Sequence, residues 1–515
     1  MLVLCGLVMA LIKTFRVGWL PEAGGCILVG SALGAFLKVM HPELDFSNFS
    51  FNSEMFMCVL LPPIIFQAAL SIDKRAFRRH LFPIGLFAVF GTALSAVLAG
   101  VIVFYLTAAS SLLPSIPLLD SLVFGSLIAS VDPVATLSIL SSVGVGKTDK
   151  IYILVFGESL LNDGVAIVLF QTLVEHLEKN VDDYDNIVAE SIKKFFLVSF
   201  GSVAVGLICS ALSAIYFRAL MHKQKPVLEV VMFFCFALIP YYVADITGGS
   251  GIIAVMTAGF FMDAVVIGNR TSTVSTTREE GTCTPEESKG HCCLTRRDIY
   301  HIFSGNGSLS VPATRHIDFV AEVLASIMET AIFAYVGVFL LVDERLRNLP
   351  LILTAILACM LSRLVAIYSL SWGVSAARSA HQACQKSPPV EDLSDQAIDK
   401  KTRLILLLSG IRGAVSLALA EDIPMYNAMT GHGSKFKSEL KAMASASVIF
   451  TVFVLGALTY YILNWTRRMV PAPESPGQVR NGDCSIDRSY ESVVSPSEES
   501  PLLGDEARTI TTSHA

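Results

Sequence analysis

Charged side chains are scarce in this sequence. Asp, Glu, Lys and Arg make up 16% of its 515 residues, and apolar residues make up 53%. Soluble proteins usually carry about 25% charged residues. Because a charged side chain is costly in the hydrocarbon of a bilayer, this balance indicates that much of the protein surface faces lipid. The net charge of −6 argues against binding to nucleic acid, which needs a basic face.

The sequence also lacks the signs of a secreted, disulfide-stabilised protein. Its 11 cysteines lie in apolar runs or in loops that we place in the cytosol below, so we expect no disulfide framework. The apolar stretch 1–12 has neither a basic region nor a small-residue cleavage site, so we identify no signal peptide. Nothing in the sequence calls for a cofactor, and we expect none.

Long apolar runs, in contrast, are abundant. A membrane-spanning helix needs about 20 consecutive apolar residues, and the runs predict an all-α, multi-pass protein in a lipid bilayer, with about 13 transmembrane helices. The predicted helices lie near residues 1–12, 23–40, 55–71, 81–107, 118–141, 150–178, 192–218, 226–246, 250–268, 318–342, 350–377, 402–422 and 440–464.

The distribution of basic residues between the loops predicts the orientation. If the N-terminus lies outside, Lys and Arg gather in the loops that then face the cytosol, such as 72–80 and 218–225, and the opposite loops are mostly charge-poor or acidic. The positive-inside rule therefore predicts an N-terminus that is outside or lumenal and a cytosolic C-terminus. Asn48 begins the one glycosylation sequon that falls in a predicted outer loop.

Two regions are too polar to span a membrane. We expect a transmembrane domain over 1–468, with a cytosolic loop at 269–317, and a disordered cytosolic tail over 469–515. A stretch with cysteines and a histidine at 283–293 could bind zinc, but its adjacent cysteines lack ligand spacing, which favours a disordered loop. The tail holds an acidic dileucine motif, of the kind that clathrin adaptors bind in endosomal sorting, at Glu498, Leu502 and Leu503.

Six ionisable residues fall near the centres of predicted spans, at Asp132, Glu158, Asp163, Glu329, Arg363 and Arg412. Such residues are costly in a membrane and mark an ion path or a compensating pair. We interpret Glu158 and Arg363, which lie at similar depth, as a structural ion pair. We assign Arg412 and Glu329 to charge compensation in the core.

The predicted helix that starts at 150 carries a cluster of oxygen ligands. Ser159 and Asp163 are four residues apart and share a face, and Asn162 lies on the adjoining one. A carboxylate with two neutral oxygens is a hard-ligand set suited to Na⁺ or Li⁺. A buried carboxylate can hold either a proton or a cation, and this change of occupant at Asp163 is sufficient for antiport.

Pro133 interrupts the predicted helix 118–141 in its middle. Proline removes a backbone hydrogen bond and disfavours helical geometry at the preceding residue. The interruption frees carbonyls around Ser130 and Val131 beside Asp132. It must line a cavity or pack against protein, because lipid cannot satisfy these groups.

Gly410 and Gly413 flank Arg412 in the middle of the predicted helix 402–422, which predicts a second interruption. Asp132 and Arg412 could each neutralise an exposed helix-end dipole. Interrupted helices at corresponding positions of two halves indicate two inverted six-helix repeats, with discontinuous helices that cross at a midplane site.

These segments resemble the monovalent cation:proton antiporter family, and within it the sodium/proton exchanger branch. The resemblance extends from about Gly24 to Ile462 and is carried by Leu60–Phe66 (LLPPIIF), Val131–Ala135 (VDPVA), Phe156–Asp163 (FGESLLND), Glu329–Thr330 and Gly410–Ala414 (GIRGA). It implies the sodium/proton antiporter fold, in a homodimer whose core moves against a dimerisation domain in an elevator-like motion.

The resemblance also implies the residues of the site, with Asp163 as the carboxylate that binds the ion and the proton. It implies an ion-binding set of Val131 (through its carbonyl), Asp132, Ser159, Asn162 and Asp163. We add Ser130, at the interruption, to this set. The Asn-Asp pair implies electroneutral exchange of one Na⁺ for one H⁺. Gln67 stands where many relatives carry a carboxylate, which puts a ligand role there in doubt.

The expected function is secondary active antiport of Na⁺ or Li⁺ against H⁺ by alternating access, in control of pH and sodium, and not enzymatic catalysis. A K⁺/H⁺ exchanger of endomembranes that uses the same site is the alternative. A cation channel lacks support because we find no repeated carbonyl filter or charge ring. An intramembrane aspartyl protease built on Asp132 and Asp163 would not explain Arg412. The expected residence is an endosomal, lysosomal or vacuolar membrane, or the plasma membrane.

Overall fold

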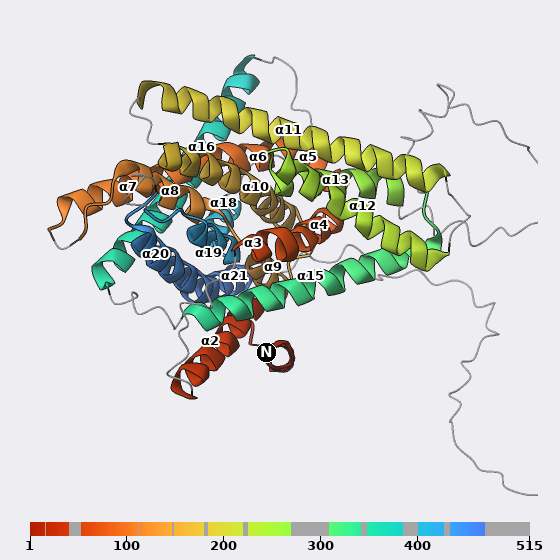
Figure 1. Ribbon diagram of the computed structural model, residues 1–515, viewed down its shortest axis with the longest axis horizontal. Coiled ribbons are helices and arrows are strands. Elements are labelled where there is room, and N and C mark those ends of the chain that lie inside the picture. The colour runs from red at the N-terminus through yellow and green to blue at the C-terminus, as the bar shows by residue number, and fades with distance from the viewer. Residues whose placement is uncertain are drawn as a thin grey trace, which may run out of the picture. The chain divides into compact units, whose positions relative to one another are not determined.

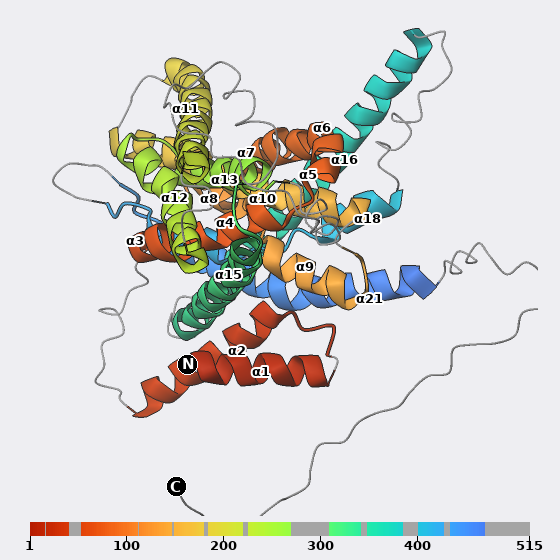
Figure 2. The same cartoon turned by 90° about the vertical axis from the view of Figure 1, so that its right-hand side faces the viewer.

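Nearly every described residue of the computed structural model lies in a helix or in a short connection between helices (Figures 1 and 2). The structure describes residues 1–15, 17–40, 53–111, 113–146, 149–179, 184–219, 225–268, 308–340, 348–384, 400–426 and 433–468. The features predicted at Asn48, at 283–293 and in the tail with Glu498, Leu502 and Leu503 lie outside these residues.

The first part of the chain folds into α1 (Leu2–Thr14), α2 (Glu22–Met40), α3 (Ser53–Met55), η2 (Phe56–Leu60), α4 (Leu61–Ser71), α5 (Lys74–Arg79), α6 (Leu81–Gly85), η3 (Leu86–Gly91), α7 (Thr92–Ala109), α8 (Leu118–Ala129), α9 (Pro133–Ser142) and α10 (Lys150–Lys179). The second part folds into α11 (Tyr184–Ala219), α12 (Pro226–Ile246), α13 (Gly251–Met262), η4 (Asp263–Ile267), α15 (Val311–Leu340), α16 (Leu349–Cys384), α18 (Lys400–Leu408), α19 (Ala414–Glu421), α20 (Lys437–Phe450), η7 (Thr451–Leu455) and α21 (Gly456–Arg468). The η segments are π-helical and continue the helices beside them.

The apolar segments predicted from the sequence coincide with helices, so the all-α class is confirmed. Within the described ranges, 9 helices are long and apolar enough to cross a bilayer. Three shorter apolar helices are α1, α8 and the combination of α13 with η4. The total number of crossings and the inverted-repeat arrangement stay predictions.

Helix α15 begins at Val311, earlier than the predicted start at 318. Ser310 caps the helix, because its hydroxyl accepts a hydrogen bond from the N–H of Ala313 at 3.4 Å. The charged residues within 315–318 made the start of this helix look like part of a polar loop. The last residues of the loop predicted at 269–317, from Val311 on, therefore belong to α15.

Helix α10 lies in the interior of the bundle, whereas α11 lies along its edge (Figures 1 and 2). In the most apolar 18-residue stretch of α10, 89% is buried, and in the corresponding stretch of α11 only 17% is buried. A helix that is apolar and buried on all sides is a core helix, and an apolar helix that stays exposed in a membrane protein faces lipid. Polar side chains on α10 therefore meet other helices and not lipid.

Two helices are interrupted in the middle, as the sequence predicted. The non-helical residues between α8 and α9 are 130–132, and those between α18 and α19 are 409–413. The two interruptions touch, because the N–H of Asp132 donates a hydrogen bond to the carbonyl oxygen of Ile411 at 2.8 Å. They form one crossing of non-helical backbone inside the bundle.

Helices α7 and α8 pack closely enough to hold the first interruption in place. A Cβ added at Gly125 of α8 would lie 2.1 Å from the carbonyl oxygen of Ala96 on α7. A Cβ added at Gly100 of α7 would lie 2.8 Å from the carbonyl oxygen of Ser121 on α8. Small residues of this kind let two helix backbones approach closely in a membrane.

Candidate functional site

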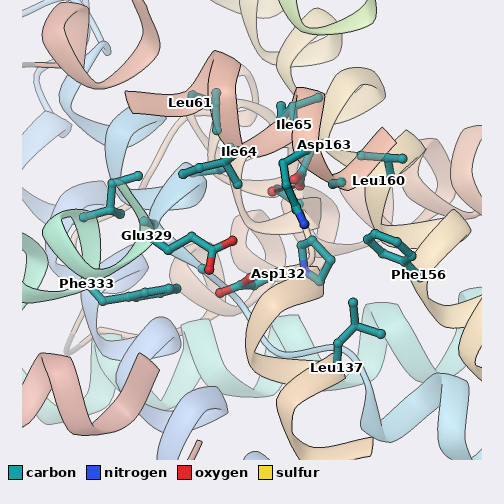
Figure 3. Close-up of a pocket in the computed structure, with 18 of the residues that line it drawn as sticks. Leu61, Ile64, Ile65, Asp132, Leu137, Phe156, Leu160, Asp163, Glu329 and Phe333 are labelled. Atoms are coloured by element: carbon teal, nitrogen blue, oxygen red, sulfur yellow. Dashed lines mark hydrogen bonds between the residues drawn. The ribbon is translucent and has the colours of Figure 1, made fainter. Parts of the chain in front are cut away.

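A cavity of about 210 Å³ lies at the crossing, between α4, α10, α15 and the two interruptions. Three carboxylates line it, from Asp132, Asp163 and Glu329 (Figure 3). Most of the remaining wall is apolar, and among the residues that the structure describes no Lys, Arg or His lines it. Such a cavity favours cations over anions.

Asp163 projects from the buried helix α10 into this cavity. Asp163 is 6% exposed. The hydroxyl of Ser130 donates a hydrogen bond to Asp163 Oδ1 at 2.6 Å. Ser130 is the first residue of the interruption after α8 and also lines the cavity. The broken helix therefore brings a hydroxyl directly to the carboxylate of α10.

Asp132 precedes the first residue of α9 and lines the same cavity. Its carboxylate and that of Glu329 on α15 point toward each other in Figure 3. Gly413, which precedes α19, also lines the cavity beside Asp132. A negative charge here lies close to the N-terminal ends of α9 and α19, where the helix dipoles favour it.

Arg412 lies behind the cavity and is 1% exposed. Its Nη1 donates to the carbonyl oxygens of Ala129 at 2.9 Å and Ser130 at 3.0 Å, at the C-terminal end of α8. Its Nε donates to the Sγ of Cys359 on α16 at 3.3 Å. The guanidinium thus satisfies carbonyls that the interruption frees, and its charge offsets the negative end of the α8 dipole.

Glu158 on α10 and Arg363 on α16 form a buried ion pair away from the cavity. Glu158 is 1% exposed and Arg363 is 5% exposed. Arg363 Nη2 also donates to the carbonyl oxygen of Leu406 at 3.0 Å, near the end of α18. The pair therefore links α10, which carries Asp163, to the second interrupted helix.

Three of the predicted ion-binding residues lie just behind the cavity wall. The Oδ1 of Asn162 accepts a hydrogen bond from the N–H of Val131 at 3.1 Å, and its Nδ2 donates to the hydroxyl of Thr92 at 2.6 Å. Ser159 is 1% exposed, and no partner for its hydroxyl lies within the described part of the chain. The structure brings Ser130, Asp132 and Asp163 to the cavity and leaves Val131, Ser159 and Asn162 outside its lining.

Several contacts at the crossing were not foreseen from the sequence. The hydroxyl of Thr136 contacts the carbonyl oxygens of Asp132 at 3.1 Å and Ser409 at 3.0 Å, and so joins both interruptions. Thr92 and Cys359 contact Asn162 and Arg412 as described above. Each of these is a single polar residue in an apolar run, and nothing in its sequence context distinguishes it from other polar residues of the spans.

Glu329 lies at the cavity, where the sequence analysis had not placed it. The sequence suggested charge compensation in the core, but Glu329 lines the cavity with the two aspartates, and Gln67 lines it as well. Its location in the middle of a predicted span was the signal that it could line a cavity inside the bundle. Whether Glu329 compensates a charge in the core or faces the cavity depends on how α15 is rotated about its own axis. The sequence does not show this rotation.

The fold and the site together define a class of protein. A membrane-embedded helix bundle in which two interrupted helices cross at buried carboxylates has the architecture of a secondary transporter. The model of the family "Sodium/hydrogen exchanger, transmembrane" matches residues 1–281 and 302–465, and the chain belongs to this family. It is a multi-pass membrane protein that acts in cation/proton antiport and is not an enzyme.

Individual relatives agree with this assignment. Human sodium/hydrogen exchanger 8 is 27% identical over 464 residues, which cover 89% of this chain and 69% of that protein. Sodium/hydrogen exchanger 5 of Arabidopsis thaliana is 28% identical over 465 residues, covering 89% and 77%. The sodium proton antiporter MjNhaP1 from Methanocaldococcus jannaschii has a similar structure with a TM-score of 0.59, over 91% of this chain and 95% of that one. At 17% identity, this last likeness concerns the fold alone.

Proposed function

We propose that this chain exchanges Na⁺, or Li⁺, for H⁺ with a stoichiometry of one to one. Asp163 holds the proton in one half of the cycle and the cation in the other. The observation that carries this proposal is the acidic cavity in which Asp163 meets Ser130 and Asp132, with no basic side chain among its described lining residues.

The ligand chemistry supports a small hard cation. A hydroxyl has one proton and two lone pairs, so Ser130 donates to the carboxylate of Asp163 and retains lone pairs for a bound cation. Carboxylate and hydroxyl oxygens are ligands that suit Na⁺ and Li⁺ and not soft metals. Proton and cation compete for the same oxygens, and this competition couples their opposite movements.

The transport cycle and the setting of the protein follow the same proposal. The site is exposed to the two sides in turn, in a homodimer whose N-terminus is outside or lumenal and whose C-terminus is cytosolic. Residence is in an endosomal, lysosomal or vacuolar membrane, or in the plasma membrane, with control of pH and sodium as the result. The dileucine motif with Leu502 and Leu503 is the feature that favours endomembranes through a clathrin adaptor.

The test is proton flux in liposomes that contain the purified protein and an internal pH-sensitive dye. Gradients of Na⁺ and Li⁺ should drive proton movement, and the substitution Asp163→Asn should abolish it while the protein remains folded and inserted. Persistent Na⁺/H⁺ exchange by Asp163→Asn would reject the assignment of that residue. Equal or faster flux with K⁺ would instead identify a K⁺/H⁺ exchanger that uses the same site.

A further inference from the structure

The side-chain amide of Asn162 is engaged at both ends. Its Oδ1 accepts from the N–H of Val131 at 3.1 Å, and its Nδ2 donates to Thr92 Oγ1 at 2.6 Å. Asn162 is 0% exposed and Thr92 is 1% exposed. An amide held in this way cannot turn its oxygen toward a cation without breaking the hydrogen bond to Val131.

The direction of these hydrogen bonds follows from what each group can donate. The N–H of Val131 is only a donor, so it must face the amide oxygen of Asn162. The amide nitrogen is also only a donor, and it then faces the hydroxyl of Thr92, which acts as the acceptor. Without an acceptor at position 92, an N–H group of Asn162 would be buried without a partner, which is costly. The N–H of Val131 therefore sets the orientation of the amide, and Thr92 supplies the acceptor that this orientation requires.

The orientation of this amide bears directly on the site. Val131 is the middle residue of the interruption 130–132, and the preceding Ser130 donates to Asp163 at 2.6 Å. Asn162 and Asp163 are neighbours on α10, so they hold neighbouring residues of the interruption. Release of Val131 would remove one of the contacts that position Ser130, whose carbonyl oxygen also accepts from Arg412 Nη1 at 3.0 Å.

Thr92 is presented by an irregular part of its helix. It directly follows the π-helical segment η3 (Leu86–Gly91) and begins α7. A π-helical segment changes the rotation of the residues that follow it relative to a regular α-helix, and such segments are frequent at functional sites. The irregularity therefore accompanies the turning of this hydroxyl toward α10.

We propose that Thr92 is a positioning residue for cation exchange, which acts through Asn162 and Val131 to keep Ser130 in place as a ligand beside Asp163. Asn162 in this arrangement is a clamp on the interrupted helix and not a ligand of the cation. The proposal rests on the proposed exchange at Asp163 and adds a residue that never touches the ion.

Two substitutions at position 92 separate the acceptor from the side-chain volume. Thr92→Val removes the acceptor at similar size, and it should raise the half-saturating Na⁺ concentration about fivefold or more, with a smaller change in the maximal rate per folded protein. Thr92→Ser retains the hydroxyl and should retain the wild-type Na⁺ dependence. The matched control is Thr172→Val on α10, because the Thr172 hydroxyl donates to the carbonyl of Val168 in its own helix at 2.7 Å.

A second readout does not depend on transport. Amide hydrogen exchange of peptides that contain Val131 should be faster in Thr92→Val and unchanged in Thr92→Ser and Thr172→Val. If the wild type moved no protons with Na⁺, the proposed function would fail, and hydrogen exchange would still decide whether the clamp exists. Thr92→Ala, which removes the same acceptor with a smaller side chain, serves if Thr92→Val does not insert.

Two results would overturn the proposal. One is hydrogen exchange at Val131 that is the same in Thr92→Val and Thr92→Ser, since the clamp would then not depend on the acceptor. The other is faster hydrogen exchange with an unchanged Na⁺ dependence, since Thr92 would then stabilise the helix without positioning the site.

Discussion

The backbone of Gly413 lies directly against the carboxylate of Asp132. A Cβ added at Gly413 would stand 2.7 Å from Asp132 Oδ2 and 2.7 Å from Asp132 Cβ. Real Cβ atoms do not approach other atoms so closely, so a larger residue at 413 must displace the aspartate or the interruption. The second interrupted helix thus leaves room for a side chain that the first one carries.

Gly413→Ala is therefore expected to lower the rate of Na⁺/H⁺ exchange by about tenfold or more, since a displacement of about 1 Å at a site can cost up to about 100-fold in rate. Proton flux in liposomes, normalised to inserted protein, measures the effect. The matched control is Gly373→Ala on α16, where an added Cβ meets nothing within 4 Å. Similar exchange by the two variants would show that the contact between Gly413 and Asp132 is not needed.

The ion pair of Glu158 with Arg363 is expected to stabilise the fold and not to take part in transport. Its two contacts are 2.5 Å and 3.0 Å long, and breaking a buried pair by removing one partner costs about 3–5 kcal/mol. Glu158→Gln and Arg363→Gln should each lower the unfolding temperature of the purified protein. Exchange of the two residues should recover only part of the loss, because the carbonyl of Leu406 would lose the donor that Arg363 supplies. A double variant no more stable than either single one would refute this view of the pair.

Glu329 is expected to strengthen cation binding without being essential. It contributes one of the three carboxylates of the cavity, so Glu329→Gln removes negative charge from the path of the ion. The half-saturating Na⁺ concentration should rise several-fold, and exchange should persist at high Na⁺. Glu322→Gln, an exposed position on the same helix, is the control and should behave as the wild type. Complete loss of exchange in Glu329→Gln would assign it a role equal to that of Asp163.

Electroneutral exchange predicts a rate that does not respond to voltage. Each elementary charge that crossed the membrane would gain about 2.3 kcal/mol per 100 mV, which would change the driving force strongly. Proton flux should therefore be the same in liposomes clamped at zero and at negative potential with a K⁺ gradient and an ionophore. A flux that changed with the clamp would show net charge movement and a different stoichiometry.

The sequence predicted the features that depend on local chemistry. Pro133 and the two glycines around Arg412 do not suit the middle of an apolar helix, and the helices break at these places. The apolar runs predicted the helices correctly, because a segment inside a bilayer must satisfy its backbone hydrogen bonds internally and a helix does so. The early start of α15 was missed because charged residues lie within 315–318, in its second turn, and the sequence did not show that Ser310 caps the helix.

The contacts within the site could not be predicted in the same way. Helical spacing shows which residues share a face of α10, but the helix is buried all round, so its pattern does not reveal which face meets the cavity. Ser159 was therefore grouped with Asp163, although only Asp163 lines the cavity. The partner of Asn162 is Thr92, a residue 70 positions earlier, and no local pattern links the two.

The guanidinium of Arg412 has a consequence for the synthesis of the chain. It reaches the carbonyls of Ala129 and Ser130 across 283 and 282 residues of sequence. While the chain is being made, α8 enters the membrane long before Arg412 exists, and its terminal carbonyls cannot be left in hydrocarbon without a partner. Until Arg412 is in place, these carbonyls must accept hydrogen bonds from water or from another temporary donor. The early half of the protein is thus committed to a structure that only the last helices can complete.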